Sequence, residues 1–600
     1  VGEQMSDQIV DCISRNAGGN PLFLEERISS LLETGVLARD DAGWHLSESL
    51  PGHMPDALER LVRSHVDRLA PLAREVVWSA SVLGAEFGMS AVRAVAEAGP
   101  GLADVISGLC DGGLLAEVRG GAEPTYRFRH ALIRDAAYKN LLKDQRRRLH
   151  AKAASFLEES SWGRLEEAAA VLGHHYARAG ETERAAHYFT LAADHAAGAF
   201  ANEEAITSVR QALELLRPGS RALSTRAAAL WEKLGDLLKR VGRYEEARAA
   251  YQEGADSVVA DEPLLAARCY AALGFLVSED LQRHDEALHA LGTAEQLLDK
   301  VTEKDSDEWV AAWLYLQLGL VQLYYWRDTK KAEEVLARER PVVEARGTPA
   351  ERANFYMHLG HVRARASRYR VDESIVADFR AARAAAEEGF AEQSTVAGTA
   401  ALMRYWMYFQ VGFALFWHGD TEAALVELNE GLTAAVRTGD KLLEVLSRTF
   451  ITVAYLRQGD VGAVKEMAPV LGDVASTVGL PENLGVARAA MSWVAWKEGR
   501  LDEVAALAQE ALDSWESSAR RYPMDWLCLF PFIGAQLSAR NYKEAAEAAR
   551  KILLPHQMRL PEELEAALEH AVTCWDEGQT DPVAQALETA LQLAEQLNYA

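Results

Sequence analysis

Apolar residues in the first quarter of the chain recur at helical spacing. Between Pro51 and Leu142 this spacing predicts short helices separated by glycine and proline residues. One of them begins at Pro71, because the first residue of a helix tolerates a missing N–H, and continues to Gly84. The others are expected after Pro55, near Ser90–Ala98, over Leu102–Cys110 and from Ala131 onward.

A strand pattern interrupts these helices. Leu114–Val118 leads into a glycine-rich turn, and Tyr126–His130 then alternates between apolar and polar residues. Strict alternation is typical of a strand with one buried face, and it places Phe128 and His130 on the same side. Three helices and one β-hairpin are the components of a winged helix, which we predict for residues 51–150.

A longer unit recurs from about Glu166 to the end of the chain. Its clearest copy contains Trp231, Leu234-Gly235, Leu238, Gly242, Ala247 and Tyr251. This is the tetratricopeptide pattern of about 34 residues, in which each unit is a pair of antiparallel helices. Gly235 and Ala247 are expected to be small because the paired helices approach closely at these positions.

Other copies keep parts of the same pattern. The copy at Leu172-Gly173 is nearly complete, and Leu273-Gly274, Leu318-Gly319 and Leu359-Gly360 begin further units. The expected turn glycines are Gly180, Gly242, Gly419, Gly459, Gly499 and Gly578. We predict roughly ten units in residues 151–600. The predicted fold is all-α: a small winged-helix domain with one β-hairpin, followed by a right-handed tetratricopeptide-repeat superhelix.

The segment Ala401–Trp417 is apolar enough to resemble a membrane span. It carries Arg404 and Gln410 in its middle, and an Arg at a bilayer centre costs at least about 2.5 kcal/mol. A helix that is apolar on nearly all sides is also what the buried layer of a repeat array requires. We therefore predict a buried helix of the array and no membrane contact.

Charge and cysteine content restrict the possible partners. Acidic residues exceed basic residues by 26, which argues against a general nucleic-acid or membrane-surface binder. The basic run from Lys139 to Lys152 is expected to be a solvated or internally paired helix face. Five scattered cysteines without metal-ligand spacing are typical of reduced thiols, which favours a cytoplasmic location.

The sequence contains no recognisable catalytic constellation. A Gly-x-x-x-x-Gly-Lys-Ser/Thr loop, a Gly-x-Ser-x-Gly elbow, a His-Glu-x-x-His pair and a kinase catalytic loop are all absent. His174 and His175 are adjacent on a predicted helix, where they point about 100° apart and cannot both bind one metal ion. We therefore expect no enzyme activity, no metal and no cofactor of this chain's own.

Aromatic residues are concentrated between Trp313 and Trp417. Candidates for a partner or inducer site on the concave face of the repeats are Tyr325, Trp326, Trp406 and Trp417. The alternative is that these rings pack between repeats in which the Leu-Gly pair has been lost. The sequence leaves both interpretations open.

Two short segments carry a resemblance to a known family. Ala17–Leu24, with the sequence Ala-Gly-Gly-Asn-Pro-Leu-Phe-Leu, resembles the lid motif of STAND ATPases, which are signal-transducing switch proteins. Phe128-Arg129-His130-Ala131-Leu132 resembles the winged-helix sensor of the same family. The resemblance implies that Asn20, Pro21 and His130 contact ATP or ADP, and only when an NTPase core is present. A His suits such a phosphate contact because its charge changes near pH 7.

The order of segments resembles the C-terminal half of bacterial regulators that begin with an adenylate/guanylate cyclase or a Ser/Thr kinase. Similar arms occur in LuxR-type and MalT-like transcription activators. The resemblance implies that residues 1–50 are the last part of the NTPase, and Val1 fits a cut fragment or an alternative start codon. Independently of the resemblance, we expect Pro51–Leu142 to move as a body relative to Leu172–Ala600, because a winged helix has its own compact core and the repeats form an elongated rod. The alternative function is a scaffold whose repeats collect protein partners.

Overall fold

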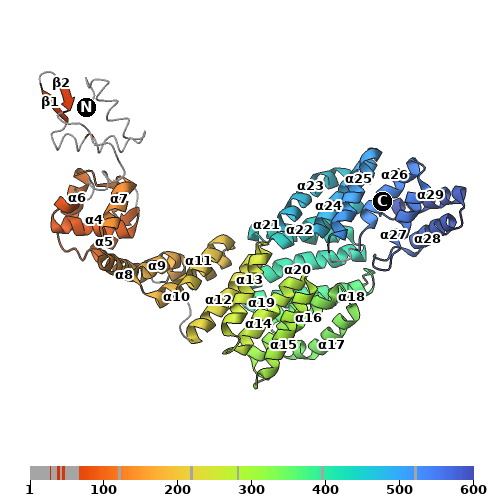
Figure 1. The fold of residues 1–600 in the computed structure, drawn as a ribbon, viewed down its shortest axis with the longest axis horizontal. Helices are drawn as coiled ribbons and strands as arrows, with labels where there is room; N and C mark the ends of the chain where they lie inside the picture. Colours follow the sequence, from red (N-terminus) through yellow and green to blue (C-terminus); the bar gives the residue numbers. More distant parts are fainter. Residues whose placement is uncertain are drawn as a thin grey trace. The chain divides into compact units, whose positions relative to one another are not determined.

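The computed structural model describes residues 28, 37–40, 43–46, 66–118, 123–161, 163–216, 221–279, 283–392, 397–518 and 523–600. The chain divides into two compact units, Val1–Ala192 and Ala193–Ala600, and each is described by itself (Figure 1). The expected lid motif and most of the helix expected after Pro55 lie outside the described residues. In the first unit, β1 (Leu37–Asp40) and β2 (Gly43–Leu46) form an antiparallel pair.

The first unit contains a small domain of helices around a three-stranded antiparallel sheet. Its helices are α4 (Pro71–Leu83), α5 (Met89–Val95) and α6 (Leu102–Asp111). Its strands are β3 (Glu86–Gly88), β4 (Leu115–Val118) and β5 (Thr125–Phe128), in the sheet order β3-β5-β4. The expected hairpin is confirmed, as are the helices expected from Pro71, near Ser90–Ala98 and over Leu102–Cys110. Strand β3 was missed because three residues are too few to show an alternating pattern.

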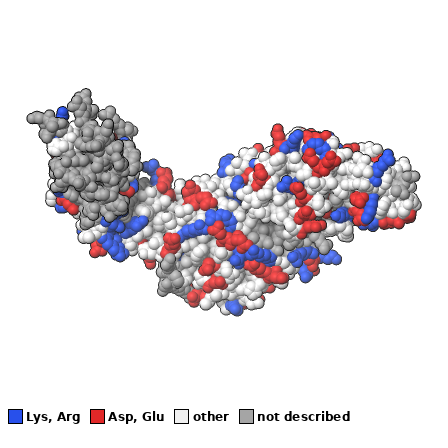
Figure 2. Space-filling view, turned by 45° about the horizontal axis from the view of Figure 1, so that its top comes forward, with Lys and Arg blue, Asp and Glu red and all other residues white. Residues whose placement is uncertain are grey.

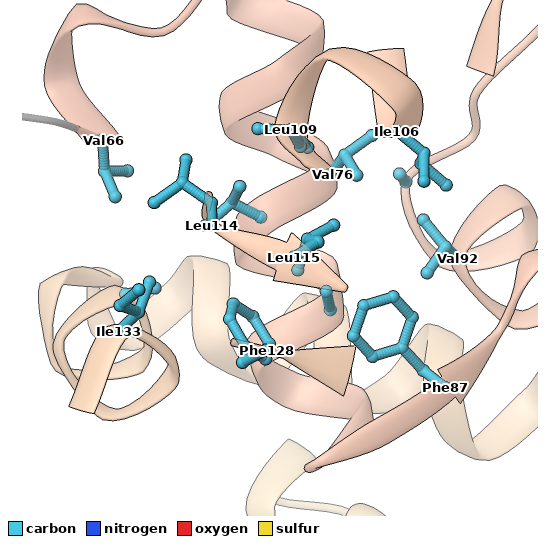
Figure 3. Packing of buried hydrophobic residues seen from close by; sticks show 14 of the residues in the cluster. Val66, Val76, Phe87, Val92, Ile106, Leu109, Leu114, Leu115, Phe128 and Ile133 are labelled. Carbon is cyan, nitrogen blue, oxygen red and sulfur yellow. The ribbon is translucent and has the colours of Figure 1, made fainter. Parts of the chain in front are cut away.

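The core of the small domain lies between this sheet and the helices (Figure 3). Phe87 of β3 and Phe128 of β5 are buried, and their ring centroids lie 5.8 Å apart in an edge-on arrangement. Val92 of α5 belongs to the same cluster. Phe128 faces the core while its neighbour Arg127 is exposed, as the alternation predicts. His130 does not share that strand face, because β5 ends at Phe128.

Two helices connect the small domain to the repeats. They are α7 (Ala131–Asn140) and α8 (Lys143–Ser160), and α9 (Leu165–Ala179) follows. Leu149 and Ala153 of α8 share a buried cluster with Val82 and Val95 of the small domain. Because α8 also packs along α9, the small domain and the first repeat helix belong to one unit, which extends to Ala192. The expected domain boundary at residue 150 falls inside α8.

The rest of the chain is an array of antiparallel helices, and this confirms the predicted tetratricopeptide-like fold. The helices are α10 (Thr182–Gly198), α11 (Asn202–Leu215), α12 (Arg221–Arg240), α13 (Tyr244–Val258), α14 (Pro263–Glu279), α15 (His284–Lys300), α16 (Asp307–Tyr325), α17 (Thr329–Arg346), α18 (Pro349–Ala366), α19 (Glu373–Glu392), α20 (Ala397–His418), α21 (Thr421–Thr438), α22 (Lys441–Arg457), α23 (Val461–Val478), α24 (Pro481–Lys497), α25 (Leu501–Glu516), α26 (Trp526–Ser538), α27 (Tyr542–Ile552), α28 (Glu562–Asp576) and α29 (Thr580–Gln596). From α12 onward they pack as consecutive pairs, α12 with α13 through α28 with α29.

Small residues bring the two helices of a pair together, as the repeat pattern predicts. A Cβ atom on Gly235 would overlap the ring of Tyr251, which is buried in the facing helix. A Cβ atom on Gly173 would lie 2.7 Å from Phe189, and one on Gly412 would lie 2.8 Å from Leu428. Any larger residue at these positions would force the paired helices apart.

Glycines also form the turns between helices. All the predicted turn glycines have positive φ, between 71° and 105°: Gly180, Gly242, Gly419, Gly459, Gly499 and Gly578. After Gly419, the Asp420 side chain accepts a hydrogen bond from Ala423 N at 3.2 Å and so begins α21. The turn pattern is thus the most accurate local signal in the sequence.

The apolar helix α20 is a buried layer of the array. Met407, Phe409 and Gln410 are buried, and α20 packs against both α19 and α21. Arg404 lies over the ring of Phe390 at 5.0 Å. In the part of the chain that the structure describes, no helix is long and apolar enough to cross a membrane.

Ion pairs connect neighbouring second helices of the repeats. Arg248 of α13 pairs with Glu286 of α15 at 3.2 Å, and Arg283 pairs with Glu245. Acidic and basic side chains are interspersed over the face in Figure 2. Such exposed pairs each contribute about 0–1 kcal/mol to stability, so packing between the helices, rather than these pairs, stabilises the array.

Candidate functional site

The expected nucleotide contacts are only partly within the described residues. Asn20 and Pro21 lie outside them. His130 has extended backbone, with φ −138° and ψ 134°, and is the residue immediately before α7. Its side chain is half-buried and forms no capping hydrogen bond with α7. The His130 imidazole is therefore not used to cap the N-terminus of α7.

Behind α7 lies a buried polar junction that joins α7, α8 and α9. The hydroxyl of Tyr138 is 2.9 Å from Nε2 of His150, and Nδ1 of His150 is 2.9 Å from Nδ1 of His175. Both imidazoles are buried. One protonation pattern satisfies all three groups: Tyr138 donates to His150 Nε2, and His150 Nδ1–H donates to His175 Nδ1.

Burial keeps both imidazoles neutral. Burial, reinforced by the nearby His175, lowers the pKa of His150 to about 3. Burial and the adjacent His174 lower the pKa of His175 to about 4. In this pattern a proton added to His175 goes to Nδ1 and breaks the hydrogen bond between the two Nδ1 atoms, whereas a proton added to His150 goes to Nε2 and removes the acceptor of the Tyr138 hydroxyl. Either charge would also be poorly solvated. At neutral pH the junction is therefore a fixed structural contact.

Two further contacts hold α8 against its neighbours. Arg146 lies 4.5 Å above the Tyr138 ring and donates to the carbonyls of Tyr138 and Leu141, at 3.1 and 3.3 Å, where a cation stabilises the end of α7. At the other end of α8, Glu158 accepts hydrogen bonds from Tyr176 and Tyr188. Burial disfavours its charge, yet these hydrogen bonds and a nearby Arg outweigh burial and lower the pKa of Glu158.

The histidines of this junction do not form a metal site. His174 is exposed while the adjacent His175 is buried, as the helical geometry predicts. Within the described ranges, no group of three or more His, Cys, Asp or Glu side chains is arranged to hold a metal ion.

The second unit contains a polar cluster that the sequence did not predict. Arg268 of α14 donates to both carboxylate oxygens of Glu232 on α12, at 2.9 and 3.1 Å. The hydroxyl of Tyr251 donates to Asp236 at 2.6 Å. The surrounding protein raises the pKa of Asp236, although this side chain keeps contact with solvent.

Tyr315 of α16 also faces this cluster. Burial, and then the charges of Asp236 and Glu232, raise the pKa of the Tyr315 phenol. Helices α12, α14 and α16, each the first helix of its repeat, therefore share one charged, aromatic face. The only sequence signal was the spacing of Glu232 and Asp236, which lie one helical turn apart at variable positions of the repeat.

The four aromatic candidates for a partner site have different surroundings. Trp417 is buried and packs against other aromatic rings, including that of Tyr369 at 4.8 Å. Trp406 is half-buried and donates from Nε1 to Asp440 at 2.8 Å. Tyr325 and Trp326 are half-buried beneath the guanidinium of Arg365, at 5.4 and 4.1 Å. Trp417 thus has a packing role, while Tyr325 and Trp326 lie nearer the surface.

The chain resembles one protein in sequence over part of its length. No protein-family model matches it. Uncharacterized protein R02095 of Rhizobium meliloti (strain 1021) is 30% identical over 228 residues, which are 37% of this chain and 21% of that protein. The match thus spans about a fifth of the relative's length.

Several solved structures resemble the fold. A STAND protein with a tetratricopeptide repeat sensor, PH0952 from Pyrococcus horikoshii, is 13% identical, with a TM-score of 0.42 over 95% of this chain and 72% of that one. A Rap protein complexed with competence and sporulation factor is 13% identical, with a TM-score of 0.44 over 62% and 97%. Yeast Tom70 is 10% identical, with a TM-score of 0.33 over 73% and 92%. The likeness concerns the helical-repeat fold, and it assigns no functional residue.

Proposed function

We propose that this chain is the regulatory arm of an ATP-dependent signalling protein. In this proposal the repeats bind a protein partner or a small inducer, and the small domain relays nucleotide state to an effector such as a nucleotide cyclase or a kinase. The repeat fold suits a binding or sensing role. The chain itself would have no catalytic activity, and ATP or ADP would be bound only together with an NTPase core.

The observation that carries this proposal is the placement of His130. It stands between the sheet of the small domain and α7, with an uncommitted side chain, and α7 leads through the buried junction to the repeats. The order helix, strand, helix, helix, strand, strand in α4–β5 supports the winged-helix assignment. A phosphate contact by His130 would therefore be connected to the first repeat helices by buried hydrogen bonds.

Two alternatives remain open. A scaffold whose repeats collect protein partners would need neither His130 nor an NTPase core. An arm of a LuxR-type or MalT-like activator would need both, but with a DNA-binding output domain in place of a cyclase or kinase. In each case the repeats, rather than the small domain, would carry the partner site.

The test uses the chain extended by its native upstream sequence. His130→Ala should weaken ADP binding about 10- to 100-fold, the cost of losing a hydrogen bond to a charged group, and raise basal output. The matched control is His289→Ala, because His289 is an exposed residue of α15. Unchanged ADP affinity and output in the His130 variant would favour the scaffold alternative. The isolated 600 residues should show no saturable ATP binding by calorimetry.

A further inference from the structure

Residues more than 200 positions apart in the second unit meet in one buried contact. Nδ2 of Asn202, at the start of α11, donates to the backbone carbonyl of Thr438 at the end of α21, at 3.0 Å. Arg240, the last residue of α12, donates to Oδ1 of Asn202 at 3.3 Å. Both Asn202 and Thr438 are buried. The array therefore curves far enough for α11 and α12 to touch the repeat of α20 and α21.

Asp440, which precedes α22, lies next to this contact on the side of α21 and α22. Its carboxylate accepts from the backbone N–H of Leu443 at 3.0 Å, which begins α22, and from Trp406 Nε1 at 2.8 Å. Burial raises the pKa of Asp440, and the positive charge of Arg240 acts in the opposite direction. Burial likewise lowers the pKa of Arg240, and the charge of Asp440 opposes that change. Arg240 and Asp440 thus compensate each other's charge across the contact.

The apolar part of the contact is small. The ring of Phe200 lies 6.4 Å from that of Tyr405, and a Cβ atom on Gly242 would lie 3.3 Å from Val478. Paired helices within a repeat instead bury whole faces, with rings such as Tyr251 pressed against the facing backbone. Regions joined by few apolar contacts open at lower free energy than regions with a continuous core.

We propose that Asn202, Arg240, Trp406, Thr438 and Asp440 form a clasp that holds the repeat array in a closed turn and opens without unfolding any repeat. The clasp residues lie at helix ends and at one first-helix position, so their separation requires only small changes in the angle between successive repeats. This inference does not depend on what the repeats bind.

The test measures the distance across the clasp in the full 600-residue chain. Spin labels on unnatural residues at Glu204 and Val436, both exposed, report the separation by electron resonance without using the native cysteines. The unsubstituted chain should give one narrow distance distribution. Asn202→Ala combined with Arg240→Ala should shift at least half of the molecules to longer distances, with helical content and melting of the repeats retained.

Two further variants make the result decisive. Asn429→Ala is the matched control, because Asn429 is exposed and bonds only to a carbonyl of its own helix at 2.7 Å. It should leave the distances unchanged. Asp440→Asn keeps one oxygen that can still cap Leu443, but it places an amide NH2 where Oδ2 accepts from Trp406 and it removes the charge opposite Arg240. It should therefore lengthen the distances in a folded array. An unchanged distribution in Asp440→Asn overturns the proposal, even if the double variant unfolds.

Discussion

Nδ1 of His150 lies 2.9 Å from Nδ1 of His175, so the helix after the small domain is bonded directly to the first helix of the repeats. The same α8 buries Leu149 and Ala153 against the small domain. Whether Pro51–Leu142 moves as a body relative to Leu172–Ala600 stays a prediction, although these contacts join the small domain to α9. The small domain, α8 and α9 form one compact unit that ends at Ala192.

The junction should make the first unit sensitive to acid. His150 and His175 have pKa values lowered to about 3 and 4, so folding favours their neutral forms. Their contribution to stability is complete above the unfolded pKa of about 6.5 and is lost as the pH falls toward these values. For each imidazole, lowering the pH from 6.5 to 5 should reduce the free energy of unfolding by up to about 2 kcal/mol. Hydrogen exchange in α8 measures this loss.

A variant separates this effect from general acid sensitivity. His150→Gln removes one buried titrating group and should flatten the pH dependence of exchange in α8. His289→Ala, at an exposed position, should leave that dependence as it is. Equal pH dependence in His150→Gln and the unsubstituted chain would mean that the junction does not govern acid sensitivity.

The close approach of α12 and α13 predicts opposite effects of the same substitution at two glycines. Gly235→Ala should destabilise the chain by about 1–3 kcal/mol, because the new Cβ overlaps the Tyr251 ring. Gly292→Ala lies in helix α15 with no atom within 4 Å of the new Cβ. It should stabilise by up to about 1 kcal/mol, because Ala favours the helix. Thermal unfolding of both variants provides the comparison.

The features that could be predicted from sequence are those determined by neighbouring residues. The turn at Gly419 needs a positive φ, and the Leu-Gly pair at Gly235 needs a small residue one helix away from Tyr251. Each requirement is satisfied within a single repeat. Both were therefore visible as spacings within about 34 residues.

The polar contacts could not be predicted because their partners are distant in sequence. His150 and His175 are 25 residues apart, and Asn202 and Thr438 are 236 residues apart. No spacing rule connects such positions, since their meeting depends on how the helices stack. His150 belongs to the basic run Lys139–Lys152, for which a solvated or internally paired helix face was expected, and its ring is buried and paired with His175. Whether His130 contacts nucleotide stays a prediction.

A buried glutamate should oppose folding at alkaline pH. Burial, with a contribution from the charge of Glu351, raises the pKa of Glu339 to about 8. Its neutral form is favoured in the folded array, so this stabilisation is complete below the unfolded pKa of about 4.5 and is lost as the pH rises through 8. Glu339→Gln should therefore stabilise the chain at pH 8 by up to about 4 kcal/mol and have little effect at pH 4.5.

The control lies on the same helix. Glu333 is exposed on α17, and Glu333→Gln should change the melting temperature equally little at both pH values. The melting temperature of Glu339→Gln, relative to the unsubstituted chain, should rise more at pH 8 than at pH 4.5. An equal difference at both pH values would mean that ionisation of the Glu339 carboxyl does not destabilise the folded protein, which contradicts the prediction.

The aromatic stretch Trp313–Trp417 can be divided into packing and partner-contacting residues by two substitutions. Trp417 is buried among aromatic rings, so Trp417→Ala should cost about 3–5 kcal/mol of stability. Tyr325 is half-buried at the end of α16 beneath Arg365, so Tyr325→Ala should lower the melting temperature much less. If this stretch holds the partner or inducer site, Tyr325→Ala should abolish the regulated output of the chain extended by its native upstream sequence, while the melting temperature stays nearly unchanged. Retained regulation in a folded Tyr325 variant, or unfolding of both variants, would contradict a partner site in this stretch.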